Sequence, residues 1–365
     1  MKKSAVKALF LILSIKKANI RRGDGKILYS AFDIYTQRCY NKQNARICEK
    51  NSKDRAGSLL VKKMKNNYPI TGTFIDEVTY DIPALNWSNE QWAKDLDNMK
   101  EVGIDTLIIM RGVFYDKCLY PSKIFHTYKE DNEDFMGMIL QEAQKRNMNV
   151  YLGMYITDLC WNYGDWKGEI AQNKKYIDEI LPRYKDFSSF KGWYIPHETG
   201  SNIYNIKETM GGLAALCKDK TPDKKVLISP FFRGVNLYPE SLTPENTADV
   251  WNNIWERCGK DIDICAFQDG TTKIQDYAEY LKHIKQATDA HGIHLWANVE
   301  TFERDVRSMF FPIPFDVMRR KIKIAQEYVE KCITFEFSHF LSPQSIFPSA
   351  HNLNALYRKY YEEKK

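Results

Sequence analysis

Short apolar runs alternate with longer amphipathic stretches along most of this chain, beginning at Pro69. The apolar runs are bounded by turn residues and end on polar side chains, which is typical of strands buried on both faces. They predict strands at 70–75, 104–110, 149–156, 190–196, 225–231, 262–267, 293–299 and 332–337. The stretches between them predict helices at 88–102, 133–146, 165–185, 201–218, 243–258, 275–291, 314–331 and 349–363.

Residues at the ends of several stretches support the helix assignments. Ser88 is followed three residues later by Gln91, the spacing of a capping box. Pro244 falls in a first helical turn, where a missing N–H costs nothing, and Gly103 and Gly292 stand just past two helix ends.

Eight successive strand–helix units predict a (β/α)8 barrel, the TIM barrel. A doubly wound open sheet is the alternative, but it usually has fewer strands and a glycine-rich first turn. The sequence contains neither G-x-G-x-x-G nor G-x-x-x-x-G-K-[ST]. No boundary signal follows Pro69, so residues 68–365 are predicted to form one barrel domain.

The net charge of +6 is distributed unevenly along the chain. Residues 1–67 carry 17 Lys and Arg against 4 Asp and Glu, whereas the remaining residues carry 36 against 43. This basic leader shows no sustained helical or strand period, so we expect it to be poorly ordered. The predicted barrel is mildly acidic, which argues against a nucleic-acid partner.

The first 15 residues resemble a secretory signal, because lysines precede a short apolar run. The run is too short to cross a bilayer, so no stable membrane span is expected. No clear small-x-small cleavage site follows, and Lys16 and Lys17 come directly after the run. A secreted or periplasmic protein is one interpretation, and a cytoplasmic protein with a disordered leader is the other.

In a (β/α)8 barrel, the residues that follow the strands form the active face. Two predicted strands end on a glutamate, FKGWYIPHE on Glu198 and IHLWANVE on Glu300. A buried strand rarely ends on a carboxylate without water or a partner, because desolvating the charge is costly. The other candidates for substrate contacts lie at or near strand ends: Asp76, Arg111, Tyr155, Asp158, Trp161, Trp166, His197, Arg233, Gln268, Asp269, Trp296 and Glu336.

Structural roles are the alternative for these side chains. Either glutamate alone fits a salt bridge at the barrel rim, although two of them on strands four and seven are harder to explain in that way. Trp161 and Trp166 fit loop packing as well as stacking on a sugar ring. Trp296 fits the core, and Arg111 and Arg233 fit neutralisation of an acidic rim.

Four motifs in order, GWYIPHE, ISPFFRG, AFQDG and LWANVETFE, resemble a family of glycosidase-like barrels from gut Bacteroidetes that carries a domain-of-unknown-function label. The resemblance spans roughly residues 70–345. Glutamates ending strands four and seven also resemble the clan of retaining (β/α)8 glycosidases. That resemblance implies a carbohydrate substrate, with Glu198 as acid/base and Glu300 as nucleophile. One position departs, because the clan has Asn before the strand-four glutamate to hydrogen-bond the sugar 2-hydroxyl, and His197 stands there.

The two roles require different surroundings. Retention needs carboxyl groups about 5–5.5 Å apart, whereas inversion needs about 6.5–9.5 Å to admit water. The acid must hold its proton near neutral pH, so Glu198 is expected in the more apolar surroundings with a raised pKa. Glu300 is expected to stay ionised among donors such as Arg or Tyr.

Other function classes fit the sequence less well. A metal-dependent hydrolase barrel needs His-x-His on its first strand, and 70–75 contains no histidine. The sequence has no H-E-x-x-H and no C-x-x-C, and a phosphate-binding barrel would have glycines after strands seven and eight. No metal or other cofactor is therefore expected. A retaining glycosidase is the leading hypothesis, and a non-catalytic carbohydrate-binding barrel is the alternative.

Overall fold

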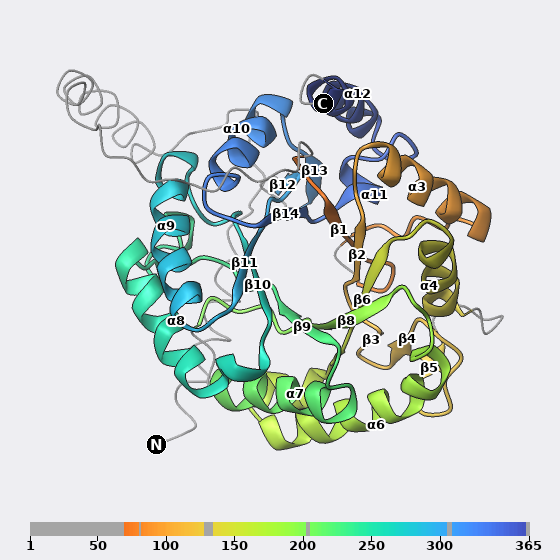
Figure 1. Cartoon of the computed structure of the whole chain (residues 1–365). Coiled ribbons are helices and arrows are strands. Elements are labelled where there is room, and N and C mark those ends of the chain that lie inside the picture. The colour runs from red at the N-terminus through yellow and green to blue at the C-terminus, as the bar shows by residue number, and fades with distance from the viewer. Residues whose placement is uncertain (1–68, 80–81, 128–133, 202–204, 305–308, 363–365) are drawn as a thin grey trace, which may run out of the picture. The chain divides into compact units, whose positions relative to one another are not determined.

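The computed structural model describes residues 69–79, 82–127, 134–201, 205–304 and 309–362. The basic leader and its signal-like segment lie outside the described residues. Eight parallel strands close into a barrel in the order β1-β14-β11-β10-β9-β8-β6-β2. The predicted (β/α)8 fold is thus confirmed (Figure 1). The strand bounds are β1 Gly72–Ile75, β2 Thr106–Ile109, β6 Asn149–Gly153, β8 Phe190–Ile195, β9 Lys225–Ile228, β10 Ile264–Gln268, β11 His294–Asn298 and β14 Lys331–Thr334.

Helices surround the barrel (Figure 1). Ser88 caps the first of them with the predicted capping box, in which its side chain accepts from the backbone N–H of Gln91. None of the described helices is long and apolar enough to cross a membrane. The outer helices are α3 Asn89–Glu101, α4 Phe135–Lys145, α6 Trp166–Tyr184, α7 Ile206–Lys220, α8 Pro244–Cys258, α9 Ile274–Ala290, α10 Phe315–Ala325 and α12 Pro348–Glu362.

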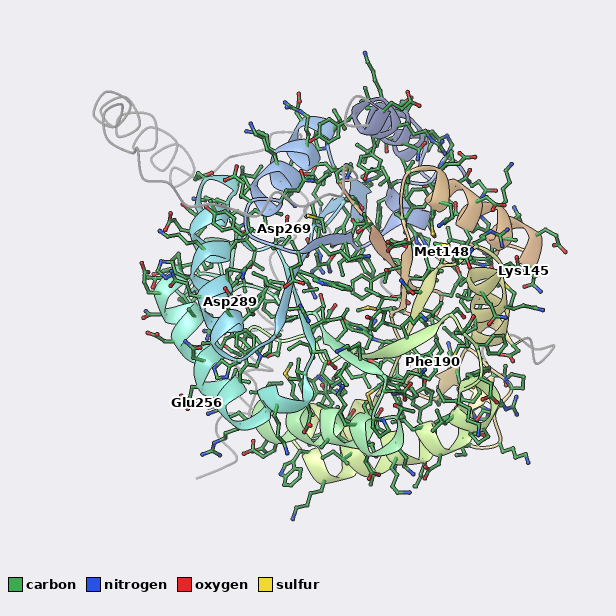
Figure 2. All side chains as sticks on the ribbon, in the orientation of Figure 1. Lys145, Met148, Phe190, Glu256, Asp269 and Asp289 are labelled. Carbon is green, nitrogen blue, oxygen red and sulfur yellow. The ribbon has the colours of Figure 1, made fainter. Side chains whose placement is uncertain are left out.

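Side chains alternate between the two sides of the barrel wall, as the period of a strand requires. Phe74, Tyr194 and Ile333 belong to a cluster that fills the barrel interior. Trp193 belongs to the larger cluster that packs between the strands and the helices. Figure 2 shows side chains filling the centre of the barrel, so the interior is a packed core. A substrate can therefore bind only at an end of the barrel, and in this fold the active face is at the carboxyl ends of the strands.

The third predicted strand is split. Its second part, β7 Tyr155–Ile156, leaves the barrel and joins β3 Val113–Phe114, β4 Lys117–Cys118 and β5 His126–Thr127 in a separate sheet. Gly153 stands at the division, where a Cβ would collide with the backbone oxygens of Ile109 and Met110. The main chains of β2 and β6 therefore approach each other too closely here for any side chain.

The last third of the chain also differs from the prediction. Helix α10 ends at Ala325, and Lys331 begins β14 instead of ending the helix. The predicted final strand stops at Thr334, and α11 Phe337–Phe340 follows it. Additional short elements are α5 Asp158–Tyr163, η1 Val235–Leu237, η2 Gly259–Asp261 and an antiparallel hairpin of β12 Phe302–Arg304 and β13 Phe310–Pro312. This hairpin lies between β11 and α10 in the chain and contributes to the site described below.

Candidate active site

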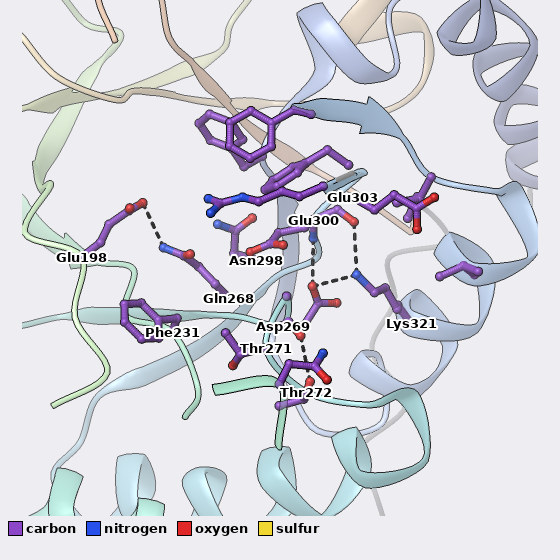
Figure 3. A pocket seen from close by; sticks show the side chains of 18 of the residues that line it. Glu198, Phe231, Gln268, Asp269, Thr271, Thr272, Asn298, Glu300, Glu303 and Lys321 are labelled. Carbon is purple, nitrogen blue, oxygen red and sulfur yellow. Dashed lines mark hydrogen bonds and ion pairs between the residues drawn. The ribbon is translucent and has the colours of Figure 1, made fainter. Parts of the chain in front are cut away.

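A cavity of about 670 Å³ opens at the carboxyl ends of the strands. Its volume lies in the range of small-molecule sites. Figure 3 shows Glu198 on one side of this cavity and a group formed by Glu300, Asp269 and Lys321 on the other. The walls combine acidic, basic, amide and aromatic side chains, among them Asp76, Arg111, Glu198, Phe231, Gln268, Asp269, Asn298, Glu300, Phe302, Arg304, Phe310, Lys321 and Phe335.

Glu198 reaches the cavity because successive side chains of strand β8 point to opposite sides of the barrel wall. Tyr194 faces the barrel interior and Trp193 faces the helices, and the inward side continues past the strand end to Glu198. At the end of β10, Gln268 donates a hydrogen bond of 3.0 Å from Nε2 to Oε1 of Glu198. The strand-four glutamate is therefore held by a residue of β10, which β9 separates from β8.

Strand β11 delivers Glu300 to the same cavity. Its backbone N–H donates to Oδ1 of Asp269 at 3.2 Å, and Nζ of Lys321 lies 2.9 Å from the same oxygen. Lys321 also donates to the backbone carbonyl of Glu300 at 3.4 Å. Gly270 leaves room for the Glu300 carboxyl group, because a Cβ there would collide with its oxygens.

The surroundings of Glu300 raise its pKa to about 8. Desolvation by the protein is the largest cause, the carboxylate of Asp269 adds to it, and the ammonium group of Lys321 opposes it. Burial likewise raises the pKa of Asp269, in spite of the attraction to Lys321. Burial disfavours the charged form of Lys321, but the two carboxyl groups raise its pKa. Two carboxyl groups share one buried cation, so the group retains a carboxyl proton at neutral pH.

This result differs from the expectation that Glu300 would stay ionised among donors. An environment that favours the protonated form is found at Glu300. The reason is desolvation of the carboxyl group together with the nearby carboxylate of Asp269, while Lys321 donates to Asp269 and to the main chain of Glu300.

Six residues predicted from the sequence line the cavity: Asp76, Arg111, Glu198, Gln268, Asp269 and Glu300. Nη1 of Arg111 lies 3.5 Å from Oδ2 of Asp76 and donates to Oγ1 of Thr79 at 2.6 Å. Oδ1 of Asp76 accepts from the backbone N–H of Val78 at 3.2 Å. Arg111 therefore neutralises an acidic group of the wall, as one interpretation of the sequence predicted.

His197 lies on the side of the strand opposite Glu198 and does not line the cavity. Its Nε2 lies 2.7 Å from Oε1 of Glu169 in α6, and its ring packs edge-on against Trp161 with centroids 4.7 Å apart. The backbone N–H of Thr157 also donates to Oε1 of Glu169. His197 is therefore a buried, hydrogen-bonded group next to α6, and a contact of its ring with the sugar 2-hydroxyl stays a prediction.

The residues predicted after strand three also fall outside the cavity lining. Tyr155 donates its hydroxyl to the backbone oxygen of Tyr115 at 2.6 Å. Trp166 is the first residue of α6 and is half-buried, and Trp161 lies in α5. Asp158 begins α5, and its side chain lies outside the described part of the structure. Stacking of a tryptophan on a sugar ring stays a prediction.

Arg233, Trp296 and Glu336 lie outside the lining as well. Trp296 packs in the barrel interior, with its ring 6.2 Å from that of Tyr151, as the structural interpretation of this residue predicted. Glu336 is fully buried and accepts from the backbone N–H of His339 at 2.9 Å, so it caps α11.

The arrangement suits chemistry carried out by carboxyl groups. Glu198 and Glu300 reach one cavity from different strands, and repulsion from Glu198 is one of the causes that raise the pKa of Glu300. Among the side chains that the structure describes, no three His, Cys, Asp or Glu are grouped as ligands for a metal ion.

Residues 70–347 match the family described as a domain of unknown function, DUF4434. The chain belongs to the DUF4434 family. The match spans the chain from just before β1 to just after α11, and so includes every strand of the barrel and both glutamates. No curated protein matches the sequence.

The DUF4434 barrel also resembles solved structures of glycoside-hydrolase type. A Bacteroides thetaiotaomicron VPI-5482 protein described as a putative alpha-L-fucosidase is 35% identical, with a TM-score of 0.77, over 85% of this chain and 99% of that chain. An endo-1,4-beta-D-mannanase from Thermotoga petrophila RKU-1 is 12% identical, with a TM-score of 0.56, over 80% of this chain and 99% of that chain. A GH18 chitinase from Pseudoalteromonas aurantia is 13% identical, with a TM-score of 0.51, over 81% and 100% of the two chains. The last two show the fold alone.

Sequence reasoning missed several residues of the DUF4434 site. Asn298 stands two positions before Glu300 on one face of the same strand, so the period of two would have found it. Lys321 lies inside α10, and no local signal marks it. The β12–β13 hairpin contributes Phe302 and Phe310, whose ring centroids are 4.6 Å apart.

Proposed function

We propose that this chain is a retaining glycoside hydrolase, with Glu198 as the acid/base and Glu300 as the nucleophile. The observation that carries the proposal is that these two glutamates, from the fourth and seventh barrel strands, line one cavity. Similarity to a glycosidase-like structure at 35% identity supports it. Retaining glycosidases use two carboxyl groups in this way.

In the first step, the Glu198 carboxyl group protonates the glycosidic oxygen while the Glu300 carboxylate attacks the anomeric carbon. The bond to the leaving group breaks, and the sugar becomes an ester of Glu300. In the second step, the Glu198 carboxylate takes a proton from water, which attacks the anomeric carbon and releases Glu300. Gln268 supports both steps, because its amide holds Oε1 of Glu198.

Attack requires Glu300 in its ionised form. Its pKa of about 8 means that a proton has to leave before or during the first step. Positive charge develops at the anomeric carbon as the glycosidic bond breaks, and a nearby positive charge favours the ionised carboxylate. The negative charge of the carboxyl groups around Glu300 therefore stabilises the transition state, in which the sugar is positively charged, more than the ground state.

For the sugar we propose alpha-L-fucosides as the first class to test, because the 35% identical relative carries that description. Fucose is a 6-deoxy sugar and presents a methyl group. Phe302, Phe310 and Phe335 form an apolar part of the cavity wall, with the Phe302 and Phe335 ring centroids 5.7 Å apart. Burying a methyl group against these rings is favourable.

A non-catalytic carbohydrate-binding barrel is the second candidate. The feature that favours it is the raised pKa of Glu300, because a protonated carboxyl group is a poor nucleophile. The hydrogen-bonding groups of the cavity would then serve only to bind a sugar.

Hydrolysis of aryl glycosides tests the proposal. The wild type, Glu198→Gln and Glu300→Gln are incubated with 4-nitrophenyl alpha-L-fucoside and a panel of other aryl glycosides, and the first-formed anomer is identified by proton NMR. We expect a retained product and a loss of about a thousandfold or more in kcat for Glu300→Gln, as for removal of other covalent nucleophiles. Full activity of Glu300→Gln, or an inverted product, would overturn the assignment. Binding without hydrolysis by the wild type would establish the carbohydrate-binding barrel.

A further inference from the structure

A single ion pair holds the main chain of Glu300 on both sides of its Cα atom. Oδ1 of Asp269 accepts from the Glu300 N–H at 3.2 Å, and Lys321 donates to the Glu300 carbonyl at 3.4 Å. The two side chains are joined to each other at 2.9 Å. Because both peptide groups of Glu300 are bonded to this pair, the direction in which its side chain leaves the strand is set by Asp269 and Lys321.

The ion pair is built into the protein interior. The side chain of Asp269 is 1% exposed and that of Lys321 is 12% exposed. The second oxygen of Asp269, Oδ2, is buried and makes no hydrogen bond within the described part of the chain. Lys321 is therefore the main compensation for the charge of Asp269, and a change in either residue leaves a buried charge without its partner.

Gly270 follows Asp269 directly and lies against the carboxyl group of Glu300. A Cβ at this position would collide with both oxygens of the Glu300 carboxyl group. The main chain after β10 thus supports the carboxyl group from one side, while the ion pair fixes the main chain from which it projects.

We propose that the Asp269–Lys321 ion pair is the positioning element for Glu300: it fixes the main chain of that residue and places two opposite charges beside its carboxyl group. This inference rests on the proposed role of Glu300 as nucleophile. Asp269 and Lys321 are positioning residues, because they act on the reaction through Glu300.

Charged or titratable groups face Glu300 from several neighbouring elements, and together with the ion pair they influence the ionisation of its carboxyl group. They are Asp269 after β10, Lys321 of α10, Glu198 after β8, Arg304 of β12 and Tyr277 of α9. Asp269 and Glu198 favour the protonated form of Glu300, whereas Lys321 and Arg304 favour the ionised form. Removing one member of the ion pair should therefore have the opposite effect to removing the other.

The two opposite effects provide the test. Asp269→Asn keeps an oxygen that can accept from the Glu300 N–H but removes the negative charge, so Glu300 should ionise at a pH lower by about one unit or more. Lys321→Met removes the cation, so the Asp269–Glu300 pair should release its proton at a pH higher by a similar amount. Lys321→Gln is measured beside Lys321→Met, since it keeps a hydrogen-bond donor and supplies a second uncharged variant. Lys321→Arg should restore the wild-type behaviour.

The measurement is carboxyl-carbon NMR of full-length protein labelled at the side-chain carboxyls of Asp and Glu, titrated between about pH 4 and pH 10. The Glu300 signal is assigned by its loss in Glu300→Gln. Lys331→Met is the matched control, because Lys331 also pairs with an aspartate, Asp105, at 2.5 Å and is 16% exposed, but does not line the cavity. It should leave the Glu300 titration unchanged.

The inference is supported if the Glu300 titration shifts in opposite directions in Asp269→Asn and Lys321→Met. In both variants kcat should then fall by more than KM changes, and the pH optimum should move in the same direction as the titration. Shifts in the same direction, or no shift in either variant, would overturn it. The titration does not depend on turnover. If the wild type hydrolyses no glycoside, the proposed function fails while the titration still tests the ion pair. If the wild type is active and the titrations do not move, the inference alone fails.

Discussion

The side-chain amide of Gln268 donates a hydrogen bond of 3.0 Å to Oε1 of Glu198. The same Nε2 donates to the carbonyl oxygen of Ser229 at 2.8 Å. Because a carbonyl oxygen can only accept, this second contact determines which end of the amide faces Glu198. Gln268, at the end of β10, thus fixes one oxygen of the proposed acid/base.

Replacing Gln268 with Leu should lower kcat/KM by about 10–100-fold, the range expected for losing a hydrogen bond to a charged group. The loss should be greatest where Glu198 acts as a carboxylate, because the amide stabilises that form. Steady-state kinetics over a pH series measure both effects. Gln172→Leu on the outer helix α6 is the control and should change neither. An unchanged pH profile in Gln268→Leu would contradict the assigned contact.

Replacing Glu198 with Ala should affect substrates according to their leaving groups. Substrates with good leaving groups, such as dinitrophenyl glycosides, need little protonation, so their first step should remain fast while poor leaving groups lose activity. Azide should then attack the glycosyl ester and give a glycosyl azide of retained configuration. Pre-steady-state kinetics and NMR of the azide product check this. Equal losses for good and poor leaving groups would assign the acid role to another residue.

Replacing Gly270 with Ala should displace the Glu300 carboxyl group at little cost in stability. The added methyl group meets the end of a flexible side chain, and Gly270 is not among the residues with positive φ. We expect kcat to fall by about tenfold or more, because small displacements of a reacting group are costly, with a nearly unchanged midpoint of denaturation. The double variant Gly270→Ala, Glu300→Gln should be no less active than Glu300→Gln alone. A further loss in the double variant would show that Gly270 acts elsewhere.

Replacing Glu300 with Gln should stabilise the protein at alkaline pH. The folded-state pKa of about 8 lies above the unfolded value near 4.5, so the folded state binds more protons between these two values. The contribution of Glu300 to stability is fully present below about pH 4.5 and is lost as pH rises to about 8. Since Gln does not titrate, Glu300→Gln should be more stable than the wild type by about 2–4 kcal/mol at pH 8 and nearly equal at pH 4. Urea denaturation at both pH values measures this difference.

Glu303 supplies the control for that stability measurement. It stands on β12 near Glu300 but is exposed, so Glu303→Gln should leave the stability at pH 8 within about 0.5 kcal/mol of the wild type. If Glu300→Gln is no more stable than the wild type at pH 8, the surroundings do not raise the pKa of Glu300.

The buried pair of His197 and Glu169 should prove structural. Replacing His197 with Ala removes the contact at 2.7 Å and leaves Oε1 of Glu169 with the backbone N–H of Thr157, so it should cost about 1–3 kcal/mol in the free energy of unfolding. Adding Glu169→Gln should recover part of this loss, and the coupling energy of the double-mutant cycle should be about 1–3 kcal/mol. Denaturant unfolding of the four proteins measures it. A large loss of kcat in a fully stable His197→Ala protein would instead place His197 in the chemistry.

Some residues of the site could be found from the sequence because they follow directly from strand ends. Glu198, Gln268, Asp269 and Glu300 come at or just after apolar strands, and parallel strands bring their carboxyl ends to one face of the barrel. His197 directly precedes Glu198, and the period of two directs adjacent side chains to opposite sides of a strand, so only Glu198 lines the cavity.

The sequence by itself determined the order of strands and helices, the closed barrel and the two glutamates on strands four and seven, because these depend on local periodicity and on the connectivity of strand–helix units. Tertiary structure alone decided the ionisation of Glu300 and the partners that hold it. Lys321 is 52 positions from Asp269 in the chain, and α10 brings it to the residues that follow β10 and β11. Burial and the balance of neighbouring charges are properties of the packed site, so a carboxyl group predicted to be ionised retains its proton there.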